Sequence, residues 1–144
     1  MVFSTATSIG VQAIFVMVNS NPEAYYSVRE LSDTIGCSKT YLNKVLKDLV
    51  EVGILVSKTG PGAGYKLAKS PKDIKLMDII STLNSRQFLT DCFFGLGKCD
   101  EEKPCPLHGD YDDFRNHIVH KLSKMNIVKA VKLGWPQLIM EKRE

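Results

Sequence analysis

Hydrophobic and polar positions in the first half of the chain predict three helices. Residues from about 7 to 19 are almost wholly apolar, which is typical of a buried helix. A second, shorter helix is expected after Ser27, because Ser27 and Glu30 have the spacing of a capping box, and Gly36 can end it in a left-handed conformation. A third helix is expected over residues 39–52. Its apolar positions recur at steps of three and four and form one face: Leu42, Val45, Leu46 and Leu49.

The turn between the second and third helices is very short. Cys37 alone separates Gly36 from Ser38, which is a good N-cap for the third helix. Two short helices joined in this way are typical of a helix-turn-helix, in which the second helix reads DNA. The same turn also occurs in ordinary three-helix bundles, so this segment alone leaves DNA binding open. Lysines on the outer face can bind phosphates, and Asn or Thr can bind base edges. The expected DNA-facing residues are Ser38, Lys39, Thr40, Tyr41, Asn43, Lys44 and Lys47.

A glycine-rich hairpin is expected directly after the third helix. Residues 54–58 predict a strand, residues 60–64 a turn, and residues 65–67 the returning strand. Such a hairpin after a recognition helix is typical of a wing that lies along a DNA groove or phosphate ridge. A nucleotide-binding loop is the alternative, but these glycines precede a strand rather than a helix. The wing residues expected at DNA are Lys58, Thr59, Gly60, Gly62 and Gly64.

The second half of the chain predicts a helix, a cysteine-containing loop and a long helix. Ser70-Pro71 marks the expected boundary between a winged helix-turn-helix domain, residues 1–72, and the remainder, residues 73–144. In the latter, the loop-like sensor region spans residues 85–108 and the long helix begins at Gly109. The fold class expected is mainly α with a small β wing. An apolar stripe on the long helix predicts a homodimer, with packing against the winged domain as the alternative. The stripe consists of Tyr111, Phe114, Ile118, Leu122, Met125 and Val128.

Composition and charge narrow the class of protein. The 144 residues are 44% hydrophobic and 24% charged, which is average for soluble globular proteins and excludes a disordered, collagen-like or rod-shaped chain. The longest apolar run is far shorter than the roughly 20 residues of a membrane span. We therefore expect a cytoplasmic protein without membrane contact. No nucleophile, base and orienting group recur at a known spacing, so no enzyme is expected. The net charge of +3 is only weakly indicative of nucleic-acid binding.

Three of the four cysteines indicate a metal or redox site. Cys92, Cys99 and Cys105 lie within 14 residues, and His108 follows three positions after the last. Structural disulfides would leave one of the three unpaired. Zinc usually needs at least one shorter Cys-x2-4-Cys spacing, whereas an iron–sulfur cluster tolerates wider gaps. A cluster is therefore favoured, with zinc or metal-free thiols as alternatives. Cys37 is expected to be a small buried residue without chemistry.

The chain resembles the Rrf2 family of bacterial winged-helix regulators over nearly its whole length. The resemblance rests on the turn and helix of residues 37–42, the wing of residues 60–68, Ser70-Pro71, and the three-cysteine loop before a long helix. It implies a homodimer that binds pseudo-palindromic, double-stranded operator DNA. In iron–sulfur members of the family, three cysteines and a nearby histidine hold a cluster, and His108 stands at the matching position.

The resemblance also bears on cluster type and on wing contacts. It favours [2Fe–2S] over [4Fe–4S], because no Asp, Glu, Cys or His precedes Glu23 to serve as an N-terminal ligand. The first cysteine gap is one residue longer than in the two-iron members, which leaves the cluster type open. Thr59 stands where the family often has Arg, so weaker minor-groove contact is expected.

The sequence therefore predicts a DNA-binding transcriptional regulator whose operator binding depends on an iron–sulfur cluster or on redox state. Of the two directions of regulation, repression is expected. The ligands expected are Cys92, Cys99, Cys105 and His108. Two alternatives stay open at this point. One is a regulator that senses through zinc or free thiols without a cluster. The other is a small iron–sulfur electron-transfer protein, against which the recognition helix and wing both argue.

Overall fold

The computed structural model describes residues 3–84 and 87–134, and it is mostly helical with one small antiparallel sheet. The expected fold class is confirmed. Among the described residues, no helix is both long enough and apolar enough to cross a lipid bilayer. In chain order the elements are α1 (Thr5–Ser20), α2 (Val28–Ile35), α3 (Lys39–Glu51), β1 (Leu55–Lys58), β2 (Gly64–Leu67), a 3₁₀ turn (Pro71–Asp73), α4 (Leu76–Leu83), α5 (Gln87–Thr90), α6 (His108–Lys124) and α7 (Ile127–Lys132).

The helix-turn-helix forms because its ends are set by local hydrogen bonds. The capping box at the start of α2 is present: Ser27 Oγ accepts from the Glu30 N–H at 3.1 Å, and Glu30 Oε2 accepts from the Ser27 N–H at 2.8 Å. Gly36 ends α2 with φ 81°, in the left-handed conformation that favours glycine. Ser38 Oγ then accepts from the Tyr41 N–H and starts α3. These predicted boundaries are confirmed.

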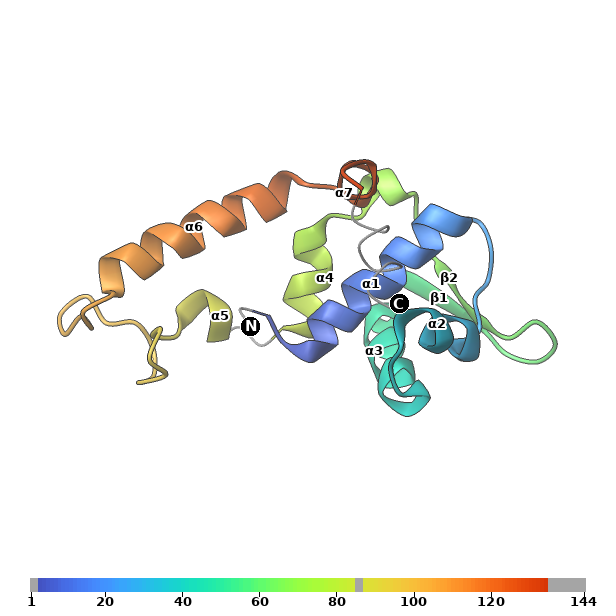
Figure 1. Cartoon of the computed structure of the whole chain (residues 1–144), viewed down its shortest axis with the longest axis horizontal. Helices are drawn as coiled ribbons and strands as arrows, with labels where there is room; N and C mark the ends of the chain where they lie inside the picture. Colours follow the sequence, from blue (N-terminus) through green and yellow to red (C-terminus); the bar gives the residue numbers. More distant parts are fainter. Residues whose placement is uncertain (1–2, 85–86, 135–144) are drawn as a thin grey trace.

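One hydrophobic core joins the winged part of the chain to the segments that follow it. Its fully buried side chains include Phe15 of α1, Leu46 of α3, Ile79 of α4 and Ile127 of α7. The Ile127 N–H also donates to the carbonyl of Ile74 at 2.8 Å. Figure 1 shows the consequence: α4 and α7 lie against the body, the wing projects at one end, and α6 extends away at the other.

The apolar stripe expected on one long helix is divided between two helices, which corrects the sequence interpretation. Helix α6 ends at Lys124, Met125 is extended, and Asn126 Oδ1 accepts from the Lys129 N–H to start α7, which carries Val128. The Met125 carbonyl accepts from the Leu76 N–H at 3.0 Å, so the break is fixed by pairing with the start of α4. An asparagine N-cap outweighs the apolar spacing here.

The two ends of the stripe have different surroundings. Leu122 and Met125 pack against the core of their own chain, as the alternative interpretation expected. Phe114, nearer the beginning of α6, is 44% exposed. The exposed aromatic side chain of the stripe therefore lies in the first half of α6.

Candidate nucleic-acid interface and cysteine site

Helix α3 presents a polar face opposite its buried one. Leu42, Val45, Leu46 and Leu49 enter the core, which turns the intervening side chains outward. Asn43 is the half-buried member of the set predicted to face DNA. The others are exposed: Ser38, Lys39, Thr40, Tyr41, Lys44 and Lys47.

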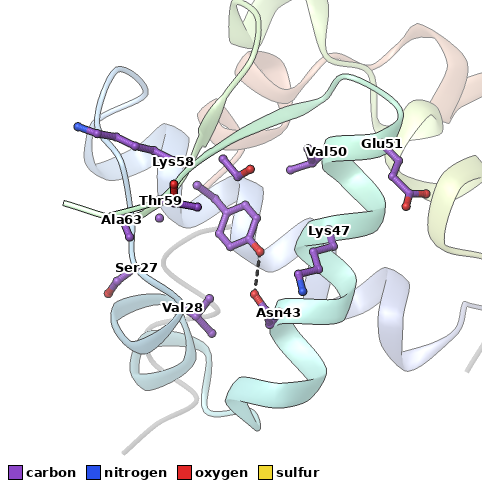
Figure 2. Close-up of a pocket in the computed structure, with 12 residues that line it drawn as sticks. Ser27, Val28, Asn43, Lys47, Val50, Glu51, Lys58, Thr59 and Ala63 are labelled. Atoms are coloured by element: carbon purple, nitrogen blue, oxygen red, sulfur yellow. Dashed lines mark hydrogen bonds between the residues drawn. The ribbon is translucent and has the colours of Figure 1, made fainter. Parts of the chain in front are cut away.

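A groove of about 550 Å³ separates α3 from the wing. Figure 2 shows Asn43 and Lys47 of α3 on one side of it and Lys58 and Thr59 of the wing on the other. The structure thus brings together residues predicted for DNA binding from two separate segments. Lysines on both walls give the groove cationic side chains of the kind that bind phosphates.

Tyr65 links the two walls, and sequence reasoning did not identify it. Its hydroxyl donates to Asn43 Oδ1 at 2.7 Å, the bond drawn as a dashed line at Asn43 in Figure 2. Its backbone is fixed as well, because Tyr65 and Tyr26 exchange two N–H···O=C bonds of 2.8 Å. Burial raises the pKa of the Tyr65 hydroxyl. An aromatic directly after the wing glycines was the signal in the sequence, but its partner 22 residues earlier was not visible there.

The wing glycines differ in their surroundings. Gly60 and Gly62 are exposed at the wing tip, with φ of 81° and 76° that favour glycine. Gly64 is buried, and a Cβ placed on it would lie 2.3 Å from the Tyr26 carbonyl oxygen. Gly64 was predicted among the DNA-contacting residues, but its position gives it a packing role: it lets the wing approach the chain before α2.

The three clustered cysteines lie in the segment between α5 and α6, residues 91–107, called here the cysteine loop. Its first part folds back on itself: the Cys92 N–H donates to Gly97 O at 2.8 Å, and the Cys99 N–H donates to Thr90 O at 2.7 Å. Gly95 and Gly97, with φ of 71° and 97°, make the reversal.

The thiols of Cys92 and Cys105 lie near enough to influence each other's pKa. The backbone N–H of Phe94 points at Cys92 and is the main cause of a lowered pKa of that thiol. Burial is the main cause of a raised pKa at Cys105, and the neighbouring Cys92 and Cys99 act in the same direction. Three sulfurs are thus close enough for their charges to interact.

Arg115 of α6 holds the cysteine loop, and it too was missed from the sequence. Its side chain is 4% exposed. Nη1 donates to the Leu89 carbonyl at 3.1 Å, and Nη2 donates to the Asp91 carbonyl and lies 3.6 Å from Cys99 Sγ. The guanidinium also stacks 4.6 Å from the ring centroid of Tyr111, one helical turn earlier. Its Nε is buried without a partner in the described structure.

The predicted ligand set is only partly assembled. Within residues 3–84 and 87–134, no group of three or more His, Cys, Asp or Glu side chains is arranged to hold a metal ion. His108 begins α6, and its backbone N–H donates to the Cys105 carbonyl at 3.0 Å. The surroundings of the sulfurs nevertheless suit a thiolate-bound, anionic group, because backbone N–H groups and a buried guanidinium face them. Cys37, which was expected to be buried, is half-buried and packs against the core.

Two short helices, a tight turn and a lysine-bearing wing define a winged-helix DNA-binding protein. The chain belongs to the Rrf2 family: the family model, described as an iron-dependent transcriptional regulator, matches residues 3–132. The family resemblance seen in the sequence is confirmed. The protein is therefore a DNA-binding transcriptional regulator of this family.

Individual relatives agree with this assignment. BadM of Rhodopseudomonas palustris is 35% identical over 133 residues, covering 89% of this chain and 80% of BadM. The transcriptional regulator IscR of Escherichia coli O1:K1 is 28% identical over 128 residues, covering 87% of this chain and 78% of IscR. Among solved structures, T. potens IscR has a TM-score of 0.71 at 24% identity, covering 91% of this chain and 86% of that one. CymR of B. subtilis, the global cysteine regulator, has a TM-score of 0.68 at 19% identity, covering 90% and 95%.

Proposed function

We propose that this regulator binds double-stranded operator DNA as a homodimer and that the state of its cysteine loop controls the binding. The observation that carries the proposal is the attachment of the loop to α6 through Arg115. The guanidinium holds the carbonyls of Leu89 and Asp91 and touches the sulfur of Cys99. A chemical change at the sulfurs would therefore act on α6 directly.

The loop state we propose is the presence of an iron–sulfur cluster, with Cys92, Cys99, Cys105 and His108 as its ligands and [2Fe–2S] as its type. Such a group would supply one-electron redox chemistry and sensitivity to iron supply. The chain's own groups would stabilise the negative charge of the ligand sulfurs. They include the N–H of Phe94 at Cys92 and the guanidinium of Arg115 at Cys99.

The route from the loop to the DNA surface would run along α6. Leu122 packs against the core at the far end of that helix, and the Met125 carbonyl binds the Leu76 N–H of α4. Helix α4 in turn packs in the core shared with α3. A rearranged loop would shift α6 and so the position of one recognition helix relative to that of the second subunit.

Exposed aromatic side chains support the homodimer. Phe114 is 44% exposed and stacks on Tyr111, and Phe93 of the cysteine loop, 57% exposed, contacts Tyr111 edge-on. A second copy placed across the first half of α6 would cover this group. Of the remaining stripe residues, Ile118 and Val128 are half-buried and are also proposed for the interface, whereas Leu122 and Met125 pack against the core of their own chain.

The test is anaerobic purification followed by iron and sulfide analysis, absorption spectroscopy and DNA selection from a random duplex library. We expect iron and sulfide in equal amounts, two of each per chain for a two-iron cluster. Cys99→Ala should lose the visible chromophore, and Cys37→Ser, the matched control, should keep it. Stoichiometric zinc without iron, or colour retained without Cys99, would overturn the cluster.

Direct thiol sensing is the second candidate, and the proximity of the Cys92 and Cys105 thiols, each of which influences the pKa of the other, favours it. A peroxide could oxidise the two thiols to a disulfide: two protons and two electrons leave the sulfurs, and the peroxide is reduced to water. Metal-free protein would then lose two hydrogens by mass spectrometry and change its DNA affinity. Protein whose DNA binding follows cluster content and ignores peroxide would exclude this route.

A further inference from the structure

The Tyr65–Asn43 hydrogen bond fixes the chemistry that α3 offers to DNA at one position. We infer that Tyr65 is a positioning residue, which holds the Asn43 carboxamide by its oxygen and thereby makes Asn43 a hydrogen-bond donor toward the bases. This inference rests on the proposed use of α3 and the wing as the DNA-reading surface, and it names what sets the specificity there.

The hydroxyl of Tyr65 is held in place from several sides. The residue is 6% exposed, and its strand partner across the wing is Ser57. Its backbone N–H and C=O are both bonded to Tyr26 at 2.8 Å. Gly64 allows this close approach, since any Cβ there would meet the Tyr26 carbonyl. The tyrosine ring is therefore part of the folded body, and its O–H has a fixed position before DNA arrives.

Asn43 is the movable partner in this contact. It is half-buried on α3 and lines the groove between helix and wing. An unrestrained asparagine can turn its amide to offer either oxygen or nitrogen to a base. With Oδ1 already accepting from Tyr65 at 2.7 Å, the amide orientation is set and the Nδ2 group keeps its donors for other partners.

The fixed orientation predicts which bases are accepted. A bidentate asparagine contact with adenine uses the amide oxygen as acceptor and the amino group as donor. With its oxygen turned toward Tyr65, Asn43 presents its amino group to the bases and favours base edges rich in acceptors, which in the major groove means the O6 and N7 atoms of guanine. We therefore expect guanine over adenine at the base pair that Asn43 contacts.

The experiment is selection from a random duplex library by the full-length dimer, followed by affinity measurements on the selected site and its single-base variants. Asn43→Ala identifies the base pair whose preference depends on Asn43. Tyr65→Phe keeps the ring and removes the hydroxyl. It should lower the guanine-over-adenine preference at that same base pair by about threefold to tenfold, as expected for one hydrogen bond. Preferences elsewhere in the site should stay as in the wild type.

Two further variants separate positioning from general damage. Thr40→Ala, on the same exposed face, should leave the preference at the Asn43 base pair intact. Asn43→Asp keeps an acceptor for the Tyr65 hydroxyl but removes the donors. The preferred base at this pair should therefore change from guanine to cytosine, whose amino group donates. This variant tests the donor role of Asn43 independently of whether Tyr65→Phe folds.

The outcomes distinguish the inference from the function on which it rests. If Asn43→Ala leaves both the affinity and the base preference unchanged, α3 does not read DNA at this position. That result would contradict both the proposed DNA-reading surface of α3 and the wing and the inference that rests on it. If Asn43→Ala changes the preference while folded Tyr65→Phe retains the wild-type preference, α3 reads DNA but Tyr65 does not position it. A uniform loss of affinity in Tyr65→Phe, with every base preference kept, also overturns the inference, because a merely structural role predicts that result.

Discussion

Nη2 of Arg115 lies 3.6 Å from Sγ of Cys99, so the buried cation of α6 faces a sulfur rather than a carboxylate. Arg115 is 4% exposed, and its guanidinium donates to the Leu89 carbonyl at the end of α5 and to the Asp91 carbonyl in the cysteine loop. Buried charges in proteins are normally compensated. The positive charge of Arg115 accordingly helps the Phe94 N–H to lower the pKa of the Cys92 thiol, whereas burial raises the pKa of Cys105.

Arg115→Gln should loosen the cysteine loop and lower the free energy of unfolding by about 1.5–3 kcal/mol, because charge-assisted bonds from a buried guanidinium to the Leu89 and Asp91 carbonyls are lost. Arg115→Lys keeps the charge but not the planar fork, so it should recover only part of the loss. Hydrogen exchange at the Cys92 and Cys99 amides, which are bonded within the loop, measures the effect. Unchanged protection of these two amides in Arg115→Gln would contradict the role given to the guanidinium.

Lys47→Ala should weaken DNA binding with little effect on folding, since the side chain is exposed beside the groove. If the lysine contacts a phosphate, the slope of log affinity against log salt should become shallower by about 0.9. Lys44→Ala should behave alike. The control is Lys124→Ala at the end of α6, which removes the same charge away from α3. Equal losses in all three variants would indicate a net-charge effect rather than a contact.

Phe114→Asp should give folded monomers, because Phe114 is 44% exposed in the single chain and proposed to be covered in the dimer. Leu122→Asp should instead destabilise the chain itself, since Leu122 packs on the core. Sedimentation reports the first effect and urea unfolding the second. Wild-type protein that sediments as a monomer at micromolar concentration would exclude the dimer.

Gly64→Ala should destabilise the protein more than Gly60→Ala does. At Gly64 the new Cβ would overlap the Tyr26 carbonyl oxygen, and overpacking of this kind typically costs about 1–3 kcal/mol. At Gly60 nothing lies within 4 Å of the new Cβ, so only the strain of the left-handed conformation, about 1–2 kcal/mol, is expected. Urea unfolding of both variants makes the comparison. A larger loss at Gly60 would mean that Tyr26 moves aside freely.

Alkylation of reduced, metal-free protein should be faster at Cys92 than at Cys105. The thiolate is the reactive form, and the Phe94 N–H lowers the pKa of Cys92 while burial raises that of Cys105. As the pH rises, Cys92 therefore ionises first. Iodoacetamide rates over a pH series, read by peptide mass spectrometry, would show the order. Faster alkylation of Cys105 would contradict the lowered pKa that the Phe94 N–H is said to give Cys92.

The sequence was sufficient where structure depends on neighbouring residues. The capping box at Ser27, the glycine end of α2 and the serine cap of α3 are all local, and each was predicted correctly. The prediction of one helix that continues to Val128 was wrong, because Asn126 caps a new helix although the apolar spacing continues past it.

Contacts between distant segments could not be predicted from the sequence. The carbonyl partners of Arg115 lie 26 and 24 residues before it, and an arginine in that position reads as an ordinary surface cation. The same is true of Tyr65, whose partner Asn43 had been assigned only to DNA. Both missed residues are recognisable only once the loop and the wing are placed against their helices.

The burial of Ile127 against the winged body has a consequence for how the protein is made. A ribosome releases the chain from its beginning, and domains fold as their segments emerge. Ile127 is fully buried and its N–H is bonded to the Ile74 carbonyl, so the core stays incomplete until the last described helix has emerged from the ribosome. By then every residue from Cys92 to His108 has already left the ribosome. Nascent chains without the cysteine loop should therefore be poor competitors for operator sites, because a stable DNA-reading surface arises only in molecules that already carry the loop.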